Sequence, residues 1–565
     1  MPTLNWIGKE AVINHHLDVP FHLLKDVPDL GCGDPGSGNL IVEGDNLLAL
    51  KALLPYYKGK VKCIYIDPPY NTGNEGWVYN DNVNSPAMQK WLGETVGKEG
   101  ETLDRHDRWL CMMYPRLALL REFLSEDGSI WVSLDDNEIH ALRYLMDDIF
   151  SGACFVSSVA WRSSDNSNND AKQFSSDYNH TVVYSKKNGW LTNRLMDDSK
   201  RSHFKNPDND QKGPWFDGNP LNSPNPRENL KYEITGPRGH KIKPPKNGWR
   251  WSKDTLAEKF ASGEIRFTQN GKGIRRRTYL HDMEGLPPSN LWIDLEETGH
   301  NRQAKYDLME IFATDDSKAV FATPKPTRLI ERILQIATKP GDLVLDSFAG
   351  SGTTGHAVLK MNAAQEGSAG TPARLDQNGG EAATKKEADK SVRAPLETRR
   401  FILVEMDEKI APDITRERVK RVAEGYTNAK GESVPGLGGS FRYVRFGDEL
   451  FDEHGRINES KVRFADLARH VYFSETGEPL PKERISAKTP LLGIHHGRAV
   501  YLLYNGILKD KSVDGGNVLT STMLEHLPTH DGPKVVFAAG CRFSKARLER
   551  EGITFKQTPY AIRTR

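Results

Sequence analysis

Apolar and polar residues in the first part of the chain alternate in a way that predicts strands followed by helices. A helical pattern at 46–54 precedes an apolar run at 61–66, which ends at Asp67. Apolar residues at helical spacing over 109–124 then lead into a further strand at 129–134. Strands that alternate with helices are typical of a parallel α/β sheet. We therefore expect an α/β fold with a Rossmann-like, doubly wound sheet.

This alternation stops and later resumes, which predicts an insertion within the sheet domain. Residues 157–318 are polar and rich in Asn, Gly, Pro, Trp and Arg, as in a loop-rich inserted domain. Alternation then returns with a strand at 343–346, and a strand at 401–405 completes the core. Between these strands, residues 364–398 have almost no bulky apolar side chain, so burial cannot offset their ordering entropy. We expect a disordered loop there.

These changes in pattern divide the chain into five regions. A small α/β domain with its own apolar strands follows the glycine-rich stretch at 436–439, and we expect it to bind another protein. The expected regions are an N-terminal arm at 1–35, the first half of the sheet domain at 36–156, the insertion at 157–318, the second half at 319–440, and the C-terminal interaction domain at 441–565.

Composition favours a soluble protein with several domains. Its 565 residues exceed what one hydrophobic core usually organises. No apolar run approaches the ~20 residues that span a bilayer, so no membrane contact is expected. His15, His16 and Asp18 stand where a secretory signal would need a continuous apolar stretch, which favours the cytoplasm.

Cysteine and histidine spacing gives no sign of a bound metal. The five cysteines are scattered without a C-x-x-C pair, and the sequence contains no H-E-x-x-H. We therefore expect neither a disulfide framework nor a metal site.

Positive charge is concentrated in one stretch of the chain, although the formal net charge is only +1. Thirteen Lys and Arg residues lie between Lys231 and Tyr279, against four Asp and Glu residues. Such a stretch can neutralise a phosphate backbone. Exposed basic loops around core tryptophans are the alternative interpretation. The candidate DNA contacts are Arg250, Arg275, Arg276 and Arg277.

The first motif with chemical potential is the D-P-P-Y turn at the end of the 61–66 strand. Ligands of open α/β sheets bind at the carboxyl ends of the strands. Pro68 and Pro69 lack backbone donors and fix φ, so carbonyl groups there can point rigidly at a ligand. A flipped base with an amino group would find acceptors at Asp67 and Pro68 and a stacking face at Tyr70. A merely rigid turn is the alternative.

The second motif is a glycine-rich turn that follows the strand at 343–346. Its sequence, D-S-F-A-G-S-G-T-T, lets a nucleoside approach the backbone closely. It lacks the G-x-G-x-x-G and G-K-[ST] patterns, so neither a dinucleotide nor a triphosphate is favoured. Glu405 later ends a strand with a carboxylate of the kind that holds ribose hydroxyls. A tight β–α turn beside an unrelated strand end is the alternative.

Together, these two motifs resemble amino-methyltransferases that act on DNA, in the order of their β class. The resemblance is closer to type III modification subunits, through G-D-N-L at 44–47, D-P-P-Y-N-T-G at 67–73, W-L-C-M-M-Y-P-R-L at 109–117, S-L-D-D-N-E at 133–138 and T-P-K-P at 323–326. It covers residues 35–450. The departure from the family pattern is the long insertion at 364–398.

The resemblance implies roles for particular residues. Asp67, Pro68 and Tyr70 would hold a flipped adenine, with Pro69 fixing the turn, and Asp in the first position favours adenine over cytosine. Lys325 would approach the methionine carboxylate of S-adenosylmethionine, and Glu405 would take the ribose. Asp45 would lie beside the cofactor, although a helix N-cap is an equal alternative. The residues that would cradle the cofactor are Asp346, Phe348, Gly350, Gly352 and Thr353.

The resemblance also implies an activity and partners. The chain would methylate adenine in duplex DNA by base flipping, with the insertion reading the sequence as a target-recognition domain. It would act with a second copy of itself and with a restriction subunit that supplies helicase and nuclease functions. A stand-alone adenine methyltransferase and a non-catalytic DNA-recognition subunit are the alternatives.

Overall fold

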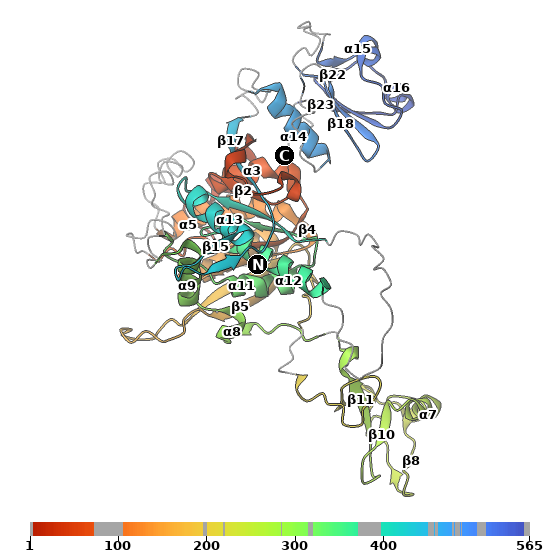
Figure 1. Cartoon of the computed structure of the whole chain (residues 1–565). Coiled ribbons are helices and arrows are strands. Elements are labelled where there is room, and N and C mark those ends of the chain that lie inside the picture. Colours follow the sequence, from red (N-terminus) through yellow and green to blue (C-terminus); the bar gives the residue numbers. More distant parts are fainter. Residues whose placement is uncertain are drawn as a thin grey trace, which may run out of the picture. The chain divides into compact units, whose positions relative to one another are not determined.

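The computed structural model forms two compact units, Met1–Leu191 with Ser289–Arg565, and Thr192–Pro288 (Figure 1). The residues described are 4–72, 105–195, 201–218, 221–283, 285–314, 320–370, 397–449, 457, 462–476, 480, 486, 489–504 and 516–558. Within these ranges, no helix combines the length and apolar character needed to cross a membrane.

One large sheet organises the first unit. Six neighbouring strands, from β17 to β4, run parallel, and antiparallel strands flank them on both sides. In the described part of the chain the sheet has ten strands, in the order β1 (His22–Asp26), β17 (Arg442–Glu449), β2 (Leu40–Glu43), β14 (Arg400–Glu405), β13 (Leu343–Asp346), β3 (Val61–Ile66), β4 (Leu124–Leu134), β6 (Tyr178–Ser185), β5 (Phe155–Arg162) and β12 (Leu291–Trp292).

Helices pack in two groups around this sheet. The first group is α3 (Asn46–Tyr57), α5 (Arg105–Phe123) and α6 (Ile139–Phe150), which share a buried cluster with alternate strand residues such as Ile64 and Ile66. The second group is α11 (Thr327–Ala337), α12 (Thr353–Gly370) and α13 (Glu417–Glu424). Strands and crossover helices in this arrangement confirm the predicted doubly wound α/β fold.

The expected insertion contains strands of the large sheet. β6 pairs antiparallel with both β4 and β5, and β12 pairs with β5. β5 and β6 carry buried apolar residues, including Val159, Val182 and Val183. The polar loop between the two strands gives this region its polar composition. The separate unit, Thr192–Pro288, is therefore shorter than the expected region 157–318.

The second unit has its own small core. A three-stranded antiparallel sheet forms from β7 (Trp215–Gly218), β11 (Ile274–Tyr279) and β10 (Ile265–Phe267), beside α7 (Lys253–Ala261). The buried side chains include Leu221, Ile242, Trp249, Leu256, Ile265 and Ile274.

The first part of the expected disordered loop is helical. α12 continues to Gly370, because its Ala, Gln and Glu residues favour a helix, so residues 364–370 are helical. Residues 371–396 of the expected loop at 364–398 lie outside the described residues.

The C-terminal part is joined closely to the sheet domain. β17 lies within the large sheet between β1 and β2, so the structural boundary follows Glu449 instead of 441. A second sheet follows, made in the described ranges of β18 (Leu491–His495), β19 (Arg498–Leu502), β21 (Lys534–Ala538) and β23 (Ile553–Gln557). Its buried core also includes Phe21 and Leu23 from the N-terminal region.

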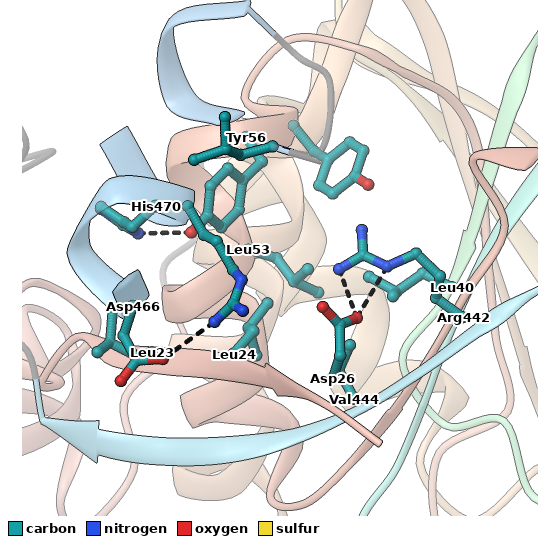
Figure 2. Close-up of a pocket in the computed structure, with 13 residues that line it drawn as sticks. Leu23, Leu24, Asp26, Leu40, Leu53, Tyr56, Arg442, Val444, Asp466 and His470 are labelled. Carbon is teal, nitrogen blue, oxygen red and sulfur yellow. Dashed lines mark hydrogen bonds and ion pairs between the residues drawn. The ribbon is translucent and has the colours of Figure 1, made fainter. Parts of the chain in front are cut away.

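A pocket of about 590 Å³ marks this junction, between α14 (Phe464–Thr476), β1, β17 and α3 (Figure 2). Tyr56 Oη and His470 Nδ1 are 2.5 Å apart across it. Arg442 donates to Asp26 at 2.7 Å on another wall. The N-terminal region and α14 are thus tied to the sheet domain by both apolar packing and hydrogen bonds.

Candidate active site

The two sequence motifs meet at the carboxyl edge of the large sheet. β3 and β13 are parallel neighbours, with Ile64 paired to Leu345, so the turns after both strands lie side by side. Ligands of such sheets bind at this edge. A pocket of about 320 Å³ opens there, lined by Tyr65, Asp67, Phe321, Thr323, Pro324, Lys325, Asp346, Phe348, Ala349, Gly350, Ser351, Thr353 and Thr354.

Asp67 is held on both carboxylate oxygens. Lys325 Nζ donates to Asp67 Oδ2 at 2.6 Å, and Tyr70 Oη donates to Asp67 Oδ1 at 2.9 Å. The Asp67 and Lys325 side chains are only 12% and 8% exposed, so water screens their ion pair weakly. Burial, and then the charge of Asp67, raise the pKa of Tyr70 well above its ordinary value, so its phenol remains a donor. Asp67 is thereby presented to the pocket as a fixed acceptor.

The D-P-P-Y turn is fixed by hydrogen bonds with Trp109 on α5 and with Glu138 at the start of α6. Trp109, on α5, donates its indole N–H to the Pro69 carbonyl at 2.7 Å. Asn71 follows the turn with φ of 58° and donates to the buried Glu138 carboxylate beside α6. No described residue donates to the Pro68 carbonyl. That carbonyl and Asp67 are the acceptors that the turn can offer to a ligand.

Asp346 is a buried carboxyl at the end of β13. Its Oδ1 accepts from Phe348 N at 3.0 Å, and its Oδ2 accepts from Thr354 Oγ1 at 2.5 Å. Burial raises the pKa of Asp346 to about 7. It forms no ion pair with any described residue, which leaves its charge to be balanced by a ligand.

Glu405 ends β14, the neighbour of β13, and is also buried. Its Oε2 accepts from Gly350 N at 2.9 Å and its Oε1 from Asp407 N at 2.9 Å. Burial raises the pKa of Glu405 to about 8, and no described cation pairs with it. Glu405 therefore braces the glycine turn beside the pocket, although it is not among the residues that line it.

The glycine turn is shaped for close approach. Gly350 and Gly352 have φ of 52° and 77°, which L side chains rarely adopt. A Cβ at Gly350 would lie 3.1 Å from the Phe321 ring, and one at Gly352 would lie 2.8 Å from the Thr415 carbonyl. Glycine is thus required at both positions, by the backbone conformation and by the close approach of Phe321 and Thr415.

Two expected cofactor residues have structural hydrogen bonds. Asp45 is the N-cap of α3, with Oδ1 accepting from the amides of Leu47 and Leu48 at 2.9 and 3.1 Å. This agrees with the N-cap alternative, and Asp45 does not line the described pocket. The Thr353 hydroxyl donates to the Lys325 carbonyl at 3.2 Å, so it holds that segment in place.

Arg418 is a buried cation that the sequence did not single out. Its guanidinium donates to Ser351 Oγ at 2.9 Å and to Thr353 Oγ1 at 2.7 Å, and burial lowers its pKa to about 10. Arg418 thus ties α13 to the glycine turn. No local motif distinguishes Arg418 from the other charged residues of α13.

The four candidate DNA contacts, all in the second unit, differ in their exposure and in their ion pairs. Arg276 donates to Glu264 at 2.8 Å, and Arg277 is paired with Asp208 and Asp210. Both therefore support the fold of this unit. Arg275 and Arg250 are exposed and form no ion pair with described residues.

The site combines acceptors for an amino group with a turn that suits a nucleoside. No three described His, Cys, Asp or Glu residues are grouped as metal ligands. Fixed acceptors at Asp67 and Pro68 suit an amino group, and the adjoining glycine turn with buried carboxyls suits a nucleoside. The fold and the site together suit the binding of a nucleoside beside an amino group.

Comparison with known proteins identifies the family. Residues 61–416 match the N6/N4 DNA methylase family, which depends on S-adenosylmethionine, and the chain belongs to this family. The matched range includes the D-P-P-Y turn and the glycine turn. The second unit, Thr192–Pro288, lies within this range in the sequence and is thus an insertion in the family domain.

Individual relatives include subunits of restriction-modification enzymes. The StyLTI Mod subunit of a type III enzyme from Salmonella typhimurium is 35% identical over 58% of this chain and 50% of its own length. The type III EcoPI Mod subunit of Escherichia phage P1 is 30% identical over 65% of this chain and 62% of its own length. The chain thus matches only half to three fifths of these relatives. The type II methyltransferase M.KpnI of Klebsiella pneumoniae is 27% identical over 65% of this chain and 86% of its own length.

Proposed function

We propose that this chain transfers a methyl group from S-adenosylmethionine to the N6 amino group of adenine in duplex DNA. The observation that carries the proposal is the Asp67 carboxylate, fixed by Lys325 and Tyr70 in one pocket with the glycine turn. This arrangement puts acceptors for an amino group beside backbone suited to a nucleoside. The bound cofactor supplies an already activated methyl group.

The buried carboxyls and the glycine turn fit the cofactor. Phe348 and the backbone from Gly350 to Gly352 would pack on its nucleoside, and Glu405 would accept the ribose hydroxyls while it braces Gly350. Lys325 lines the same pocket, so its remaining N–H groups can reach a methionine carboxylate. Lys325 would therefore orient both the cofactor and Asp67.

The D-P-P-Y turn fits a flipped adenine. The adenine amine is a weak nucleophile because its lone pair is delocalised into the ring. Acceptors at Asp67 and Pro68 draw the amino hydrogens and favour an sp³ nitrogen, whose lone pair can face the methyl carbon. Tyr70 offers its ring for stacking. After transfer the nitrogen carries an extra proton, and the Asp67 carboxylate can accept it.

DNA recognition would fall largely to the second unit. Arg275 and Arg250 are exposed in its basic stretch and can contact phosphates, whereas Arg276 and Arg277 hold the unit together. We therefore narrow the candidate phosphate contacts to Arg275 and Arg250.

We further propose that the chain is the modification subunit of a type III restriction-modification system in the cytoplasm. The Salmonella and phage P1 relatives, which are type III Mod subunits, support this role. A second copy of the chain and a nuclease subunit would be its partners. The second candidate is a stand-alone methyltransferase, supported by the 86% coverage of M.KpnI.

Sequencing of modified bases in DNA from cells with and without the protein tests the activity. We expect N6-methyladenine at one short sequence only in cells that contain it. N4-methylcytosine at such a sequence would show that the enzyme methylates cytosine. Unmodified DNA would contradict the proposed activity. Capture of a helicase-nuclease subunit with the native protein would separate the type III role from the stand-alone role.

A further inference from the structure

A protruding hairpin carries the most exposed aromatic side chain among the large hydrophobic residues described. β5 and β6 are joined by the loop 163–177, and the hairpin extends away from the body of the sheet at the lower left of Figure 1. Phe174 in this loop is 95% exposed. A phenylalanine can bury roughly 150–250 Å² of surface, so its display on a polar loop indicates a binding role.

Sheet topology places this loop at the catalytic edge. β4 runs parallel to β3, with Ile66 paired to Val132, so both strands end at the edge that carries Asp67. β6 runs antiparallel to β4, with Leu134 paired to His180, so β6 begins at that same edge. The loop before β6 therefore emerges beside the active site, two strands or about 10 Å from β3.

Side chains connect the hairpin directly to the catalytic strand. Tyr65, two residues before Asp67, donates to Ser133 Oγ at 3.1 Å, and Ser133 is 3.1 Å from Thr181 Oγ1 on β6. All three side chains are buried. The base of the hairpin is thus fixed relative to Asp67.

The loop itself is organised by hydrogen bonds. Asp177 accepts from the hydroxyls of Ser167 and Ser175, and Ser175 Oγ accepts from Asn168 N at 2.6 Å. Arg302 donates to Asp165 at 2.8 Å. These contacts preorganise the loop in the conformation that displays Phe174, which lowers the entropy lost when it binds.

The composition of the loop, more than its charge, suits contact with bases. Residues 163–177 carry three carboxylates and one lysine, Lys172. Asp165 is paired with Arg302 and Asp177 lies near Arg162, whereas Asp170 adds to the negative charge of the loop. Asn166, Asn169 and Gln173 can donate to or accept from base edges. An aromatic ring flanked by amide side chains matches the wedges that proteins insert between base pairs.

We propose that Phe174 enters the duplex at the target site and stabilises the gap left when adenine turns toward Asp67. The inference rests on the proposed methylation of duplex DNA and names a positioning residue for it. Extrusion of a base breaks its pairing and stacking, and an aromatic ring restores part of the lost stacking. Phe174 would therefore favour the flipped state without touching the reacting atoms.

Substitution of Phe174 in the full-length protein tests this role. The substrate is a duplex of the methylated sequence with 2-aminopurine at the target position, whose fluorescence rises when it leaves the stack. For Phe174→Ala we expect a smaller fluorescence rise and a kcat/KM for methylation of unlabelled duplex at least about tenfold lower, since base–aromatic stacking is worth about one factor of ten or more. Phe174→Tyr should keep both signals.

A duplex with an abasic site opposite the adenine separates flipping from other roles. Pairing no longer opposes flipping there, so flipping limits the rate less, and the loss for Phe174→Ala should be clearly smaller than on the paired duplex. The matched control is Ile494→Ala, which removes another exposed apolar side chain, on β18, and should change nothing.

Distinct outcomes would overturn the inference. Equal fluorescence and rate for Phe174→Ala and wild type would make the hairpin a solvated loop. An equal loss on paired and abasic duplexes, together with a smaller mass of the protein complex, would make Phe174 a protein contact. Absence of transfer by the wild-type protein would instead contradict the proposed function, and the aminopurine signal would still report on Phe174.

Discussion

At the residue scale, the Asp67 carboxylate is held by one donor from its own turn, Tyr70, and by one from a distant part of the chain, Lys325. Lys325 lies 258 residues from Asp67 and donates to it at 2.6 Å. The D-P-P-Y motif indicated that Asp67 was an acceptor. Its ion pair with Lys325 could not be predicted, because the order of strands in the sheet brings two such distant residues together. The ion pair makes Asp67 and Lys325 interdependent.

Replacement of Asp67 should therefore affect turnover far more than binding. For Asp67→Ala we expect a loss of about 10²–10³-fold in kcat, because the acceptor matters most as the nitrogen rehybridises. Cofactor and DNA affinities should remain near those of wild type. Labelled methyl transfer measured beside equilibrium binding checks this.

Asp67→Ala leaves the buried Lys325 without its partner and should therefore also lower stability, so a second variant is needed. Asp67→Ala with Lys325→Met removes both charges and should restore thermal stability without restoring transfer. Near-normal transfer by either variant would show that the D-P-P-Y turn is not part of the active site.

Burial of Asp346 and Glu405 predicts that cofactor binding depends on pH. Their pKa values are raised to about 7 and about 8, so the free protein retains part of these protons at pH 7. Ribose hydroxyls and a sulfonium favour the carboxylate anions, so binding should release on the order of one proton and tighten as pH rises from 6 to 8. Calorimetry in buffers of different ionisation enthalpy measures this release.

The control for this pH effect is Glu405→Gln, which should bind more weakly and release fewer protons. Raised pKa values also mean that these carboxyls stabilise the free protein fully below pH ~4 and lose that contribution as pH rises through about 7 and 8. Binding that neither releases protons nor varies with pH would contradict this description of the pocket.

At the element scale, the sequence predicted individual strands well and their partners poorly. The expected strands at 61–66 and 343–346 agree with β3 and β13, and the helical pattern at 46–54 falls within α3. These elements are continuous apolar or amphipathic runs, whose pattern is local. β6 and β17 were assigned outside the core because their places in the sheet depend on partners far along the chain.

The β11 strand gives a prediction that separates DNA contacts from structural cations. Arg275→Gln should lower the slope of log affinity for DNA against log salt by roughly 0.9, because one phosphate contact is lost. Its thermal stability should not change, since Arg275 is exposed and has no ion pair with described residues. Binding titrations across salt concentrations measure the slope.

Arg277→Gln is the matched comparison on the same strand. It should lower the melting temperature, because Asp208 and Asp210 lose their shared partner and Trp215 loses a cation 4.3 Å from its ring. If Arg275→Gln left the salt slope unchanged, Arg275 would be a solvated residue instead of a phosphate contact.

At the scale of the whole molecule, the proposal assigns methyl transfer and the reading of the DNA sequence to separate compact units of one chain. The unit with the large sheet carries both turns and the Phe174 hairpin, and the unit Thr192–Pro288 carries the basic stretch. Within the first unit, α14 packs between the C-terminal sheet and β1. Removal of residues from 441 onward would also remove β17 from within the large sheet.

The α14 junction can be tested without a truncation. Tyr56→Phe removes the buried hydroxyl that faces His470 and should lower the free energy of unfolding by about 1–3 kcal/mol. Tyr144→Phe, at a side chain 44% exposed, is the matched control and should change it little. Denaturant unfolding of the two variants measures the difference, and equal stabilities would mean that this contact does not hold the junction.

The central claim is that this site methylates the N6 amino group of adenine, and the product nucleoside tests it most directly. Purified protein would be incubated with labelled S-adenosylmethionine and duplex DNA, and the DNA would be digested to nucleosides and separated. We expect label in N6-methyl-2′-deoxyadenosine with wild type and a loss of about 10²–10³-fold in its rate of formation with Asp67→Ala. Label in N4-methyl-2′-deoxycytidine, or equal labelling by the two proteins, would contradict the proposed function.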